Sequence, residues 1–144
     1  MKNITDFKGV IPAVLSVFDK DEKLDEQATR EFIRYLMSFD IGGLYLTGST
    51  GEAFLMNSAE RMRQVEIVMD EVGGKLPVVV HVGAISTKES IELAKQAERA
   101  GAAGISSVPP FCVIFSVCAV EMLPSPPTVV ARIMRPLADT SPEL

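Results

Sequence analysis

The stretch "GGLYLTGSTGEAF", from Gly42 to Phe54, connects an apolar segment to a polar turn. Its first part, "GLYLTG" at 43–48, is apolar with little alternation, which is typical of a parallel strand buried on both faces. The part that follows holds the adjacent hydroxyls of Ser49 and Thr50 between two glycines. In α/β proteins, ligands bind at the carboxyl ends of the strands, so this turn is a candidate site.

Three other segments repeat the buried-strand pattern, at 9–17, 77–83 and 104–108. The four predicted strands therefore begin near residues 10, 43, 78 and 104, about 30 residues apart, which is the length of one strand and one helix. This alternation predicts a parallel sheet.

Helices are predicted between the strands from cap residues and hydrophobic periodicity. One begins at Asp25 and ends near "DIGG", one runs from an Asn57/Glu60 capping box to Gly73, and one runs from a Ser86/Glu89 capping box to Gly101. The first helix is expected to bury a stripe of Ala28, Phe32, Tyr35, Leu36 and Phe39. The second is expected to bury Met62, Val65, Val68, Met69 and Val72.

Two architectures fit this alternation, an open doubly wound sheet and a section of a (β/α)8 barrel, whose complete form takes about 250 residues. The length of 144 residues by itself favours the open sheet. Both architectures bring "TGSTGE", "HVGAIST" and "VPPF" to the same edge of the sheet.

The composition, with 47% apolar residues, 23% charged residues and a net charge of -5, is that of one soluble domain with an acidic surface. Nucleic acid is not an expected partner, and neither is a membrane, because the longest apolar run, "FCVIFSVCAV", is shorter than the roughly 20 residues of a membrane-spanning helix. Cys112 and Cys118 lack the spacing of a zinc site and are interpreted as small apolar residues. A cytoplasmic location is expected.

The composition changes after Phe111. No glycine follows Gly104, no lysine follows Lys95, and prolines become frequent, so a further strand and helix unit is not predicted. We expect a division into 1–111, which carries the regular pattern, and 112–144, an irregular tail. A frameshift or truncation after about residue 111 would account for the change.

The hydroxyls of Ser49 and Thr50, together with the amides between Gly48 and Gly51, suit a carboxylate or a phosphate. A small carboxylate is the better match because no "GK[ST]" sequence follows. The alternative is that the two hydroxyls cap a helix whose first turn contains Glu52. The pattern alone leaves both interpretations open.

His81 is the single histidine and lies within an apolar strand. One histidine without carboxylate partners does not make a metal site, so a packed or pocket-lining imidazole is expected, and no metal. Tyr35 and Tyr45, the only tyrosines, offer no obvious general base.

Five segments resemble, in order and spacing, the first half of the pyruvate-dependent class I aldolase family that includes N-acetylneuraminate lyase and dihydrodipicolinate synthase. They are "GVIPAVLSVF", "GGLYLTGSTGEAF", "ERMRQVEIV", "LPVVVHVGAIST" and "AGAAGISSVPPF". The resemblance covers about residues 7–111 and implies a TIM (β/α)8 barrel of which this chain carries about four units, in place of an open sheet. "GSTGEAF" and "HVG" are more similar to the bacterial N-acetylneuraminate lyase branch.

The resemblance implies that Ser49 and Thr50 bind the carboxylate of pyruvate, a small 2-keto acid, without a cofactor. It also implies a Schiff-base lysine on strand six and a proton-shuttling tyrosine on strand five. None of the seven lysines here stands at the position of that nucleophile, and "PPF" is followed by Cys112 and Val113 where the family usually has tyrosine. We therefore expect no catalytic residue in this chain and no activity from it alone.

The activity implied for the family branch is cleavage of N-acetylneuraminate to pyruvate and N-acetylmannosamine. Three alternatives remain for this chain: dihydrodipicolinate synthase or another 2-keto acid aldolase, a half-barrel that needs a partner polypeptide, and a non-catalytic module that binds a small acid. Full-length members of the family are homo-oligomers, typically tetramers.

Overall fold

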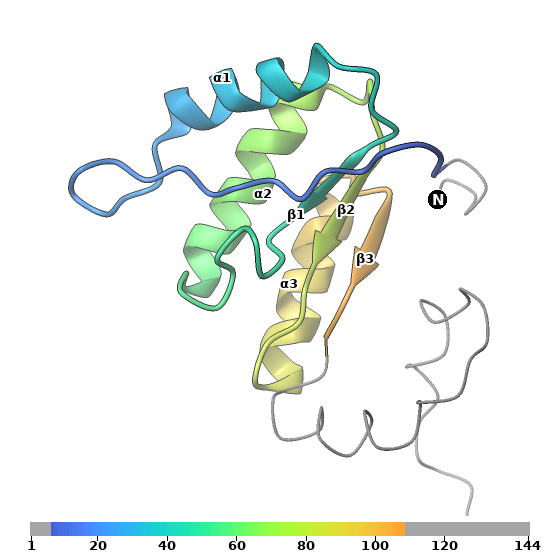
Figure 1. Cartoon of the computed structure of the whole chain (residues 1–144). Helices are drawn as coiled ribbons and strands as arrows, with labels where there is room; N and C mark the ends of the chain where they lie inside the picture. The colour runs from blue at the N-terminus through green and yellow to red at the C-terminus, as the bar shows by residue number, and fades with distance from the viewer. Residues whose placement is uncertain (1–6, 109–144) are drawn as a thin grey trace, which may run out of the picture. The chain divides into compact units, whose positions relative to one another are not determined.

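The computed structural model describes residues 7–108, so the predictions for the tail at 112–144 lie outside the described residues. Helices and strands alternate along the described part, as expected (Figure 1). The helices are α1 (Glu26–Met37), α2 (Ser58–Val72) and α3 (Thr87–Arg99), and the strands are β1 (Leu44–Leu46), β2 (Val78–His81) and β3 (Gly104–Ser106). No helix among these residues is both long and apolar enough to cross a bilayer.

The three strands form one parallel sheet in the order β1-β2-β3. Tyr45 is in register with Val79, and Val79 with Gly104. The predictions of strands within 43–48, 77–83 and 104–108 are therefore confirmed, although each strand is shorter than its apolar segment.

The predicted strand at 9–17 is wrong as a strand, because this segment makes only one isolated parallel bridge, between Ala13 and Tyr45. The amide of Val14 donates to Tyr45 O (2.9 Å), and the amide of Tyr45 donates to Pro12 O (3.0 Å). Pro12 has no N–H with which to extend a ladder. Val14 is buried, but Val10 and Leu15 are 65% and 50% exposed, so the segment is not buried on both faces.

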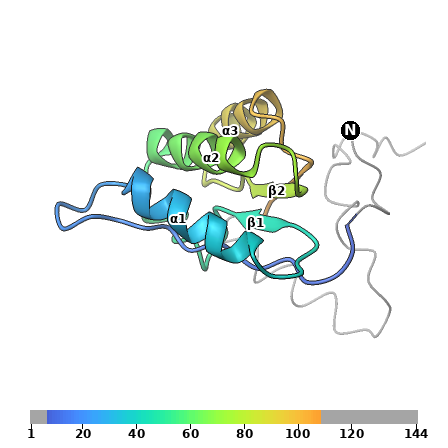
Figure 2. The ribbon, with the colours of Figure 1, turned by 90° about the horizontal axis from the view of Figure 1, so that it is seen from above.

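The arrangement of the helices distinguishes the two architectures. α1 packs against α2, and α2 packs against α3, so the helices form one layer beside the sheet (Figure 2). A doubly wound sheet has helices on both faces and a reversal of strand order. Strands in chain order with helices on a single face are the arrangement of a (β/α)8 barrel, so the open sheet favoured by length is wrong.

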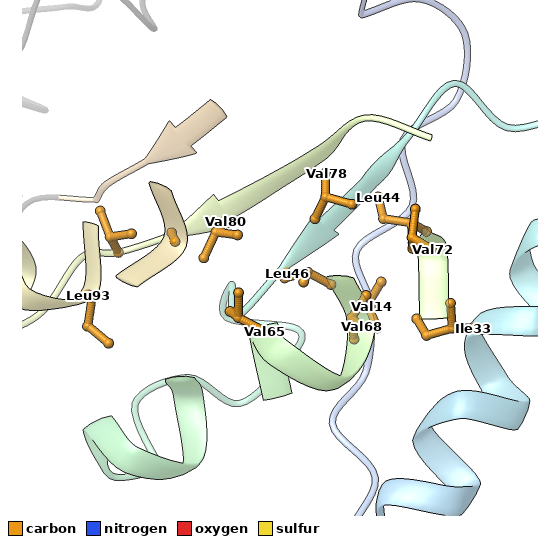
Figure 3. Close-up of a cluster of buried hydrophobic side chains, with 12 residues drawn as sticks. Val14, Ile33, Leu44, Leu46, Val65, Val68, Val72, Val78, Val80 and Leu93 are labelled. Carbon is orange, nitrogen blue, oxygen red and sulfur yellow. The ribbon is translucent and has the colours of Figure 1, made fainter. Parts of the chain in front are cut away.

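The core lies between the sheet and the helix layer (Figure 3). The alternate residues of β1 and β2 that point into it are Leu44, Leu46, Val78 and Val80. The helices contribute Ile33, Val65, Val68, Val72, Leu93 and Ala97. Tyr45 and Val79, one position along, are on the opposite face and only half-buried, so that face is left for other contacts.

The caps of α2 are formed as predicted. Asn57 Oδ1 accepts from the amide of Glu60 (3.0 Å), and a Glu60 carboxylate oxygen accepts from the amide of Asn57 (2.9 Å). Gly73 ends the helix at φ 56°, a conformation that glycine adopts without strain. The predicted stripe is also confirmed, with Val65, Val68 and Val72 buried.

The capping box predicted for α3 is only half formed. Ser86 accepts from the amide of Glu89. The Glu89 carboxylate does not return to Ser86 and instead accepts from the hydroxyl of Ser58, which ties the start of α3 to the start of α2.

The stripe predicted for α1 is partly wrong. Tyr35 and Phe39 are 60% and 52% exposed and stack edge to face with each other, with ring centroids 5.0 Å apart. Thr29 and Ile33 are the buried residues of this helix. Thr29 tolerates burial because its hydroxyl donates to Asp25 O (2.6 Å). A search for apolar residues at helical spacing does not find a buried threonine.

Candidate functional site

The turn that follows β1 is closed by its own backbone. The amide of Glu52 donates to Ser49 O (3.0 Å), and the amide of Ala53 donates to Gly48 O (3.2 Å). Helix α2 begins only at Ser58 and is capped by Asn57. The alternative in which Ser49 and Thr50 cap a helix with Glu52 in its first turn is therefore wrong.

Ser49 and Thr50 are both exposed at the tip of this turn. Neither their hydroxyls nor their amides donate to another residue in the 7–108 part of the chain. Two hydroxyl and two amide donors are thus open at the carboxyl end of β1. Such a group of donors suits an anion.

The two glycines of the turn are required for a different reason than the sequence suggested. Neither Gly48 nor Gly51 has a positive φ, whereas Thr47 and Glu52, which flank the turn, have φ 52° and 56°. A Cβ on Gly48 would lie 2.5 Å from the Tyr45 ring, and one on Gly51 would lie 2.8 Å from a backbone oxygen. Close packing excludes side chains here, and the strain lies at Thr47 and Glu52.

Ser16, in the N-terminal segment, holds the turn through a contact that the sequence did not predict. Its hydroxyl donates to Gly51 O (2.6 Å) and lies 3.1 Å from the side-chain oxygen of Gln64, a fully buried residue of α2. The N-terminal segment, the turn and α2 are thereby joined. The residues are 35 and 48 positions apart, so no local pattern could have revealed the contact.

His81, at the end of β2, is 1% exposed. Its Nδ1 lies 2.9 Å from Thr47 O, and its Nε2 lies 3.2 Å from the amide nitrogen of Val108. The Phe54 ring stands edge-on to the imidazole with centroids 6.0 Å apart. The expectation of a packed imidazole is confirmed.

Arg61 of α2 reaches the same place from the helix layer and is 3% exposed. It donates from Nη2 to His81 O (2.9 Å) and from Nη1 to Gly83 O (3.0 Å). Burial lowers the pKa of Arg61 from its ordinary value, while the negative charge of Glu89 opposes that change. Arg61 thus binds the last carbonyl of β2 and a carbonyl of the segment that follows it.

Tyr45 lies on the face of the sheet opposite the core. Its hydroxyl is 2.7 Å from the hydroxyl of Ser106 on β3, and its ring packs against Gly48. The structure thus brings the ends of β1, β2 and β3 together, as predicted for "TGSTGE" and "HVGAIST". Of "VPPF", only Val108 lies within the described residues.

A Schiff-base nucleophile needs a desolvated amine. All lysines within residues 7–108 are exposed, namely Lys8, Lys20, Lys23, Lys75, Lys88 and Lys95. The described part of the chain therefore contains donors for an acid but no activated amine.

Comparison with known proteins agrees with this geometry. Two curated relatives are N-acetylneuraminate lyase of Citrobacter koseri, 46% identical over 111 residues, and N-acetylneuraminate lyase 2 of Escherichia coli O6:H1, 48% identical over 111 residues. Each alignment covers 77% of this chain, but only 37% and 36% of the relative. The chain thus spans little more than a third of the length of these relatives.

Solved structures show the same fold. A sialic acid aldolase of Ruminococcus gnavus with a mutated catalytic lysine superposes with a TM-score of 0.73 at 35% identity, covering 76% of this chain and 36% of the other. YagE of Escherichia coli K12, a protein of the dihydrodipicolinic acid synthase family solved in complex with pyruvate, gives a TM-score of 0.68 at 35% identity, with 70% and 34% covered. The barrel assignment is confirmed.

The model of the dihydrodipicolinate synthetase family matches residues 6–121, which is most of the chain. The resemblance found in five sequence segments is therefore confirmed. This chain belongs to the dihydrodipicolinate synthetase family, and its curated relatives are N-acetylneuraminate lyases.

Proposed function

We propose that this chain carries the acid-binding part of an N-acetylneuraminate lyase site and binds the carboxylate of pyruvate through Ser49 and Thr50. The observation that carries the proposal is the open set of hydroxyl and amide donors at the tip of the turn after β1. The YagE relative, which was solved with pyruvate, supports the choice of acid.

The chemistry follows from the charge of the ligand. A carboxylate accepts several hydrogen bonds at once, and bonds to a charged acceptor are stronger than neutral ones. The closed backbone of the turn holds the donors in place before the acid arrives, because Glu52 and Ala53 already donate within it. Binding of the acid therefore needs little ordering of this backbone.

Cleavage of N-acetylneuraminate needs an amine that attacks the keto carbon, and we propose that this chain does not supply one. Its lysines within 7–108 are all exposed, so none of them is desolvated as the nucleophile of such a reaction must be. The chain would hold the acid, and any cleavage would need a lysine from a second polypeptide.

Titration with pyruvate, followed by saturation-transfer NMR, tests the binding site. We expect the Ser49→Ala and Thr50→Val variants each to bind pyruvate about 10-fold more weakly, since each loses one hydrogen bond to a charged acceptor. Ser38→Ala is the matched control because the Ser38 hydroxyl bonds to Tyr35 O at the far end of α1. Equal affinity in all four proteins would reject Ser49 and Thr50 as the binding residues.

Reduction with borohydride in the presence of pyruvate tests the absence of catalysis. We expect the intact mass of the chain to stay unchanged, because no lysine of the described part is desolvated. The Citrobacter koseri relative, treated in parallel, is the positive control. A pyruvate adduct on any lysine of this chain would show that it carries its own nucleophile.

A further inference from the structure

Thr47 and His81 bond to each other in both directions. The Thr47 hydroxyl lies 2.8 Å from His81 O, and His81 Nδ1 lies 2.9 Å from Thr47 O. Both residues are 1% exposed. The pair therefore joins the ends of β1 and β2 away from solvent.

Thr47 is also the strained residue from which the turn starts. Its φ of 52° is rare for a residue branched at Cβ, and such backbone strain persists only where the surroundings hold it. The hydrogen bonds with His81 are a direct restraint on this residue. Ser49 follows two residues later, so the direction in which Thr47 leaves β1 decides where the acid-binding donors lie.

The protonation of the imidazole is fixed by its neighbours. The Val108 amide can only donate, so Nε2 must be the unprotonated nitrogen, and Nδ1 must carry the hydrogen that goes to the Thr47 carbonyl. A second hydrogen on Nε2 would face the Val108 N–H directly. The arrangement accepts the neutral ring and excludes the imidazolium.

The groups around the imidazole also disfavour a positive charge. Arg61 of α2 bonds to the carbonyl of His81, Phe54 covers the ring edge-on, and Gly83 lies against it, since a Cβ there would be 2.7 Å from Nε2. Burial lowers the pKa of His81, the positive charge of Arg61 adds to this effect, and the bond to the Thr47 carbonyl opposes it.

From this geometry we propose that His81, as the neutral Nδ1–H tautomer, is a positioning residue that holds the acid-binding turn through the carbonyl of Thr47 and the segment after β3 through the amide of Val108. The proposal rests on the proposed function for its ligand, because the turn that it holds is the one assigned to pyruvate. The two hydrogen bonds of the His81 ring, to Thr47 O and from the Val108 amide, are called the clamp below. The clamp is a property of the fold and is tested separately.

The clamp has a pH dependence with a definite sign. An imidazole whose pKa is lower in the folded chain than in the unfolded chain stabilises the fold above about pH 6.5, and this contribution is lost as the pH falls. Protonation would add a hydrogen at Nε2 and break the bond to Val108, whereas Nδ1 would still donate to the Thr47 carbonyl. Protonation of His81 should therefore speed amide exchange at Val108, while the affinity for pyruvate should change little.

The first test is NMR of the full chain labelled with 15N-histidine, which gives one set of imidazole signals because His81 is the only histidine. We expect Nδ1 to show the shift of a protonated ring nitrogen and Nε2 that of an unprotonated one at neutral pH, and titration below pH 6.5. The Nε2–H tautomer, or a titration at or above that value, would overturn the clamp whether or not pyruvate binds.

The second test uses variants that keep one bond each. His81→Asn retains a donor near the position of Nδ1, His81→Gln retains an acceptor near Nε2, and His81→Ala retains neither. We expect His81→Ala to bind pyruvate about 10-fold more weakly, and His81→Asn, which keeps the donor to the Thr47 carbonyl, to bind with close to the original affinity. Amide exchange at Val108 should stay slow in His81→Gln and become fast in His81→Ala.

Thr29→Ala is the matched control, because it removes a buried side-chain bond to backbone in α1. It should lower stability without lowering pyruvate affinity. If His81→Ala binds as well as the unmodified chain, His81 is not a positioning residue. If pyruvate binds to none of the proteins, the proposed function fails, and the tautomer and the exchange at Val108 then decide the clamp alone.

Discussion

The glycines of the turn after β1 leave no room for a side chain. A Cβ at Gly51 would meet a backbone oxygen of Val14 at 2.8 Å, and backbone cannot move aside as a flexible side chain can. We expect Gly51→Ala to cost about 1 to 3 kcal/mol in the free energy of unfolding measured with urea. Gly104→Ala is the control, since its Cβ would have ordinary contacts at 3.7 Å and its φ is not positive. Equal costs for the two variants would contradict this account.

Single residues of the site show where prediction from sequence stops. The donors Ser49 and Thr50 could be predicted because the two hydroxyls and the glycines that flank them are adjacent in the sequence. The clamp of His81 could not, because it joins residues 34 and 27 positions away, and nothing local indicates which atoms will meet. The strain at Thr47 could not be predicted because a positive φ is expected at glycine. Here the neighbouring glycines have ordinary φ values, and the threonine has the positive one.

At the scale of elements, α2 depends on its N-terminal cap. Asn57 satisfies the amide of Glu60 and receives the carboxylate of Glu60 in return. We expect Asn57→Ala to destabilise the fold by about 1 kcal/mol, measured by thermal or urea unfolding. Asn57→Ser should recover most of that loss, because a hydroxyl can accept the same amide hydrogen. A serine variant as unstable as the alanine variant would show that the loss of stability does not come from the missing cap.

The contact between α1 and α2 carries a pH dependence of its own. Glu71 accepts hydrogen bonds from Arg34 (2.7 Å) and Arg30 (3.3 Å), and these partners lower the pKa of its carboxyl group. A carboxyl group with a lowered pKa stabilises the fold above its unfolded value of about 4.5, and the contribution is lost as the pH falls. Stability should therefore fall less steeply below pH 5 in Glu71→Gln than in the unmodified chain, as measured by urea midpoints.

Salt provides the control for this pair of helices. Charges at the surface are screened over about 8 Å at physiological ionic strength and over less at higher salt, so the difference between Glu71→Gln and the unmodified chain should shrink in concentrated salt. A difference that persists at high salt would indicate lost packing of the side chain and not lost charge.

Elements were predicted well where the signal was local and poorly where it was not. The cap of α2 and its buried stripe lie within a few residues of each other, and both were found. The segment at 9–17 was predicted as a strand from its apolar residues, but a ladder also needs an unbroken series of backbone donors and acceptors. Pro12 lacks the donor, and only β1 lies beside the segment in the described part of the chain.

At the scale of the whole molecule, the described sheet has two edges, and a barrel has none. Val10 and Leu15 are exposed along one edge, and Ile105 and Val108, 40% and 41% exposed, along the other. These edges would be covered in a closed barrel by the remaining strands, which the longer relatives are expected to contain. We therefore predict that the edges bind a polypeptide that carries those strands.

Co-expression with the part of the Citrobacter koseri relative that follows the matched 111 residues tests this prediction. We expect a soluble complex on size-exclusion chromatography that cleaves N-acetylneuraminate, because the added part would supply the lysine while this chain supplies the acid-binding turn. Ile105→Lys should weaken the complex by placing a charge at the edge, whereas Tyr35→Lys, on the exposed side of α1, should not. Two proteins that stay separate and inactive would mean that these edges do not recognise the missing strands. A complex that forms without activity would keep the edges as the binding surface and would require the turn of Ser49 and Thr50 to be misplaced in it.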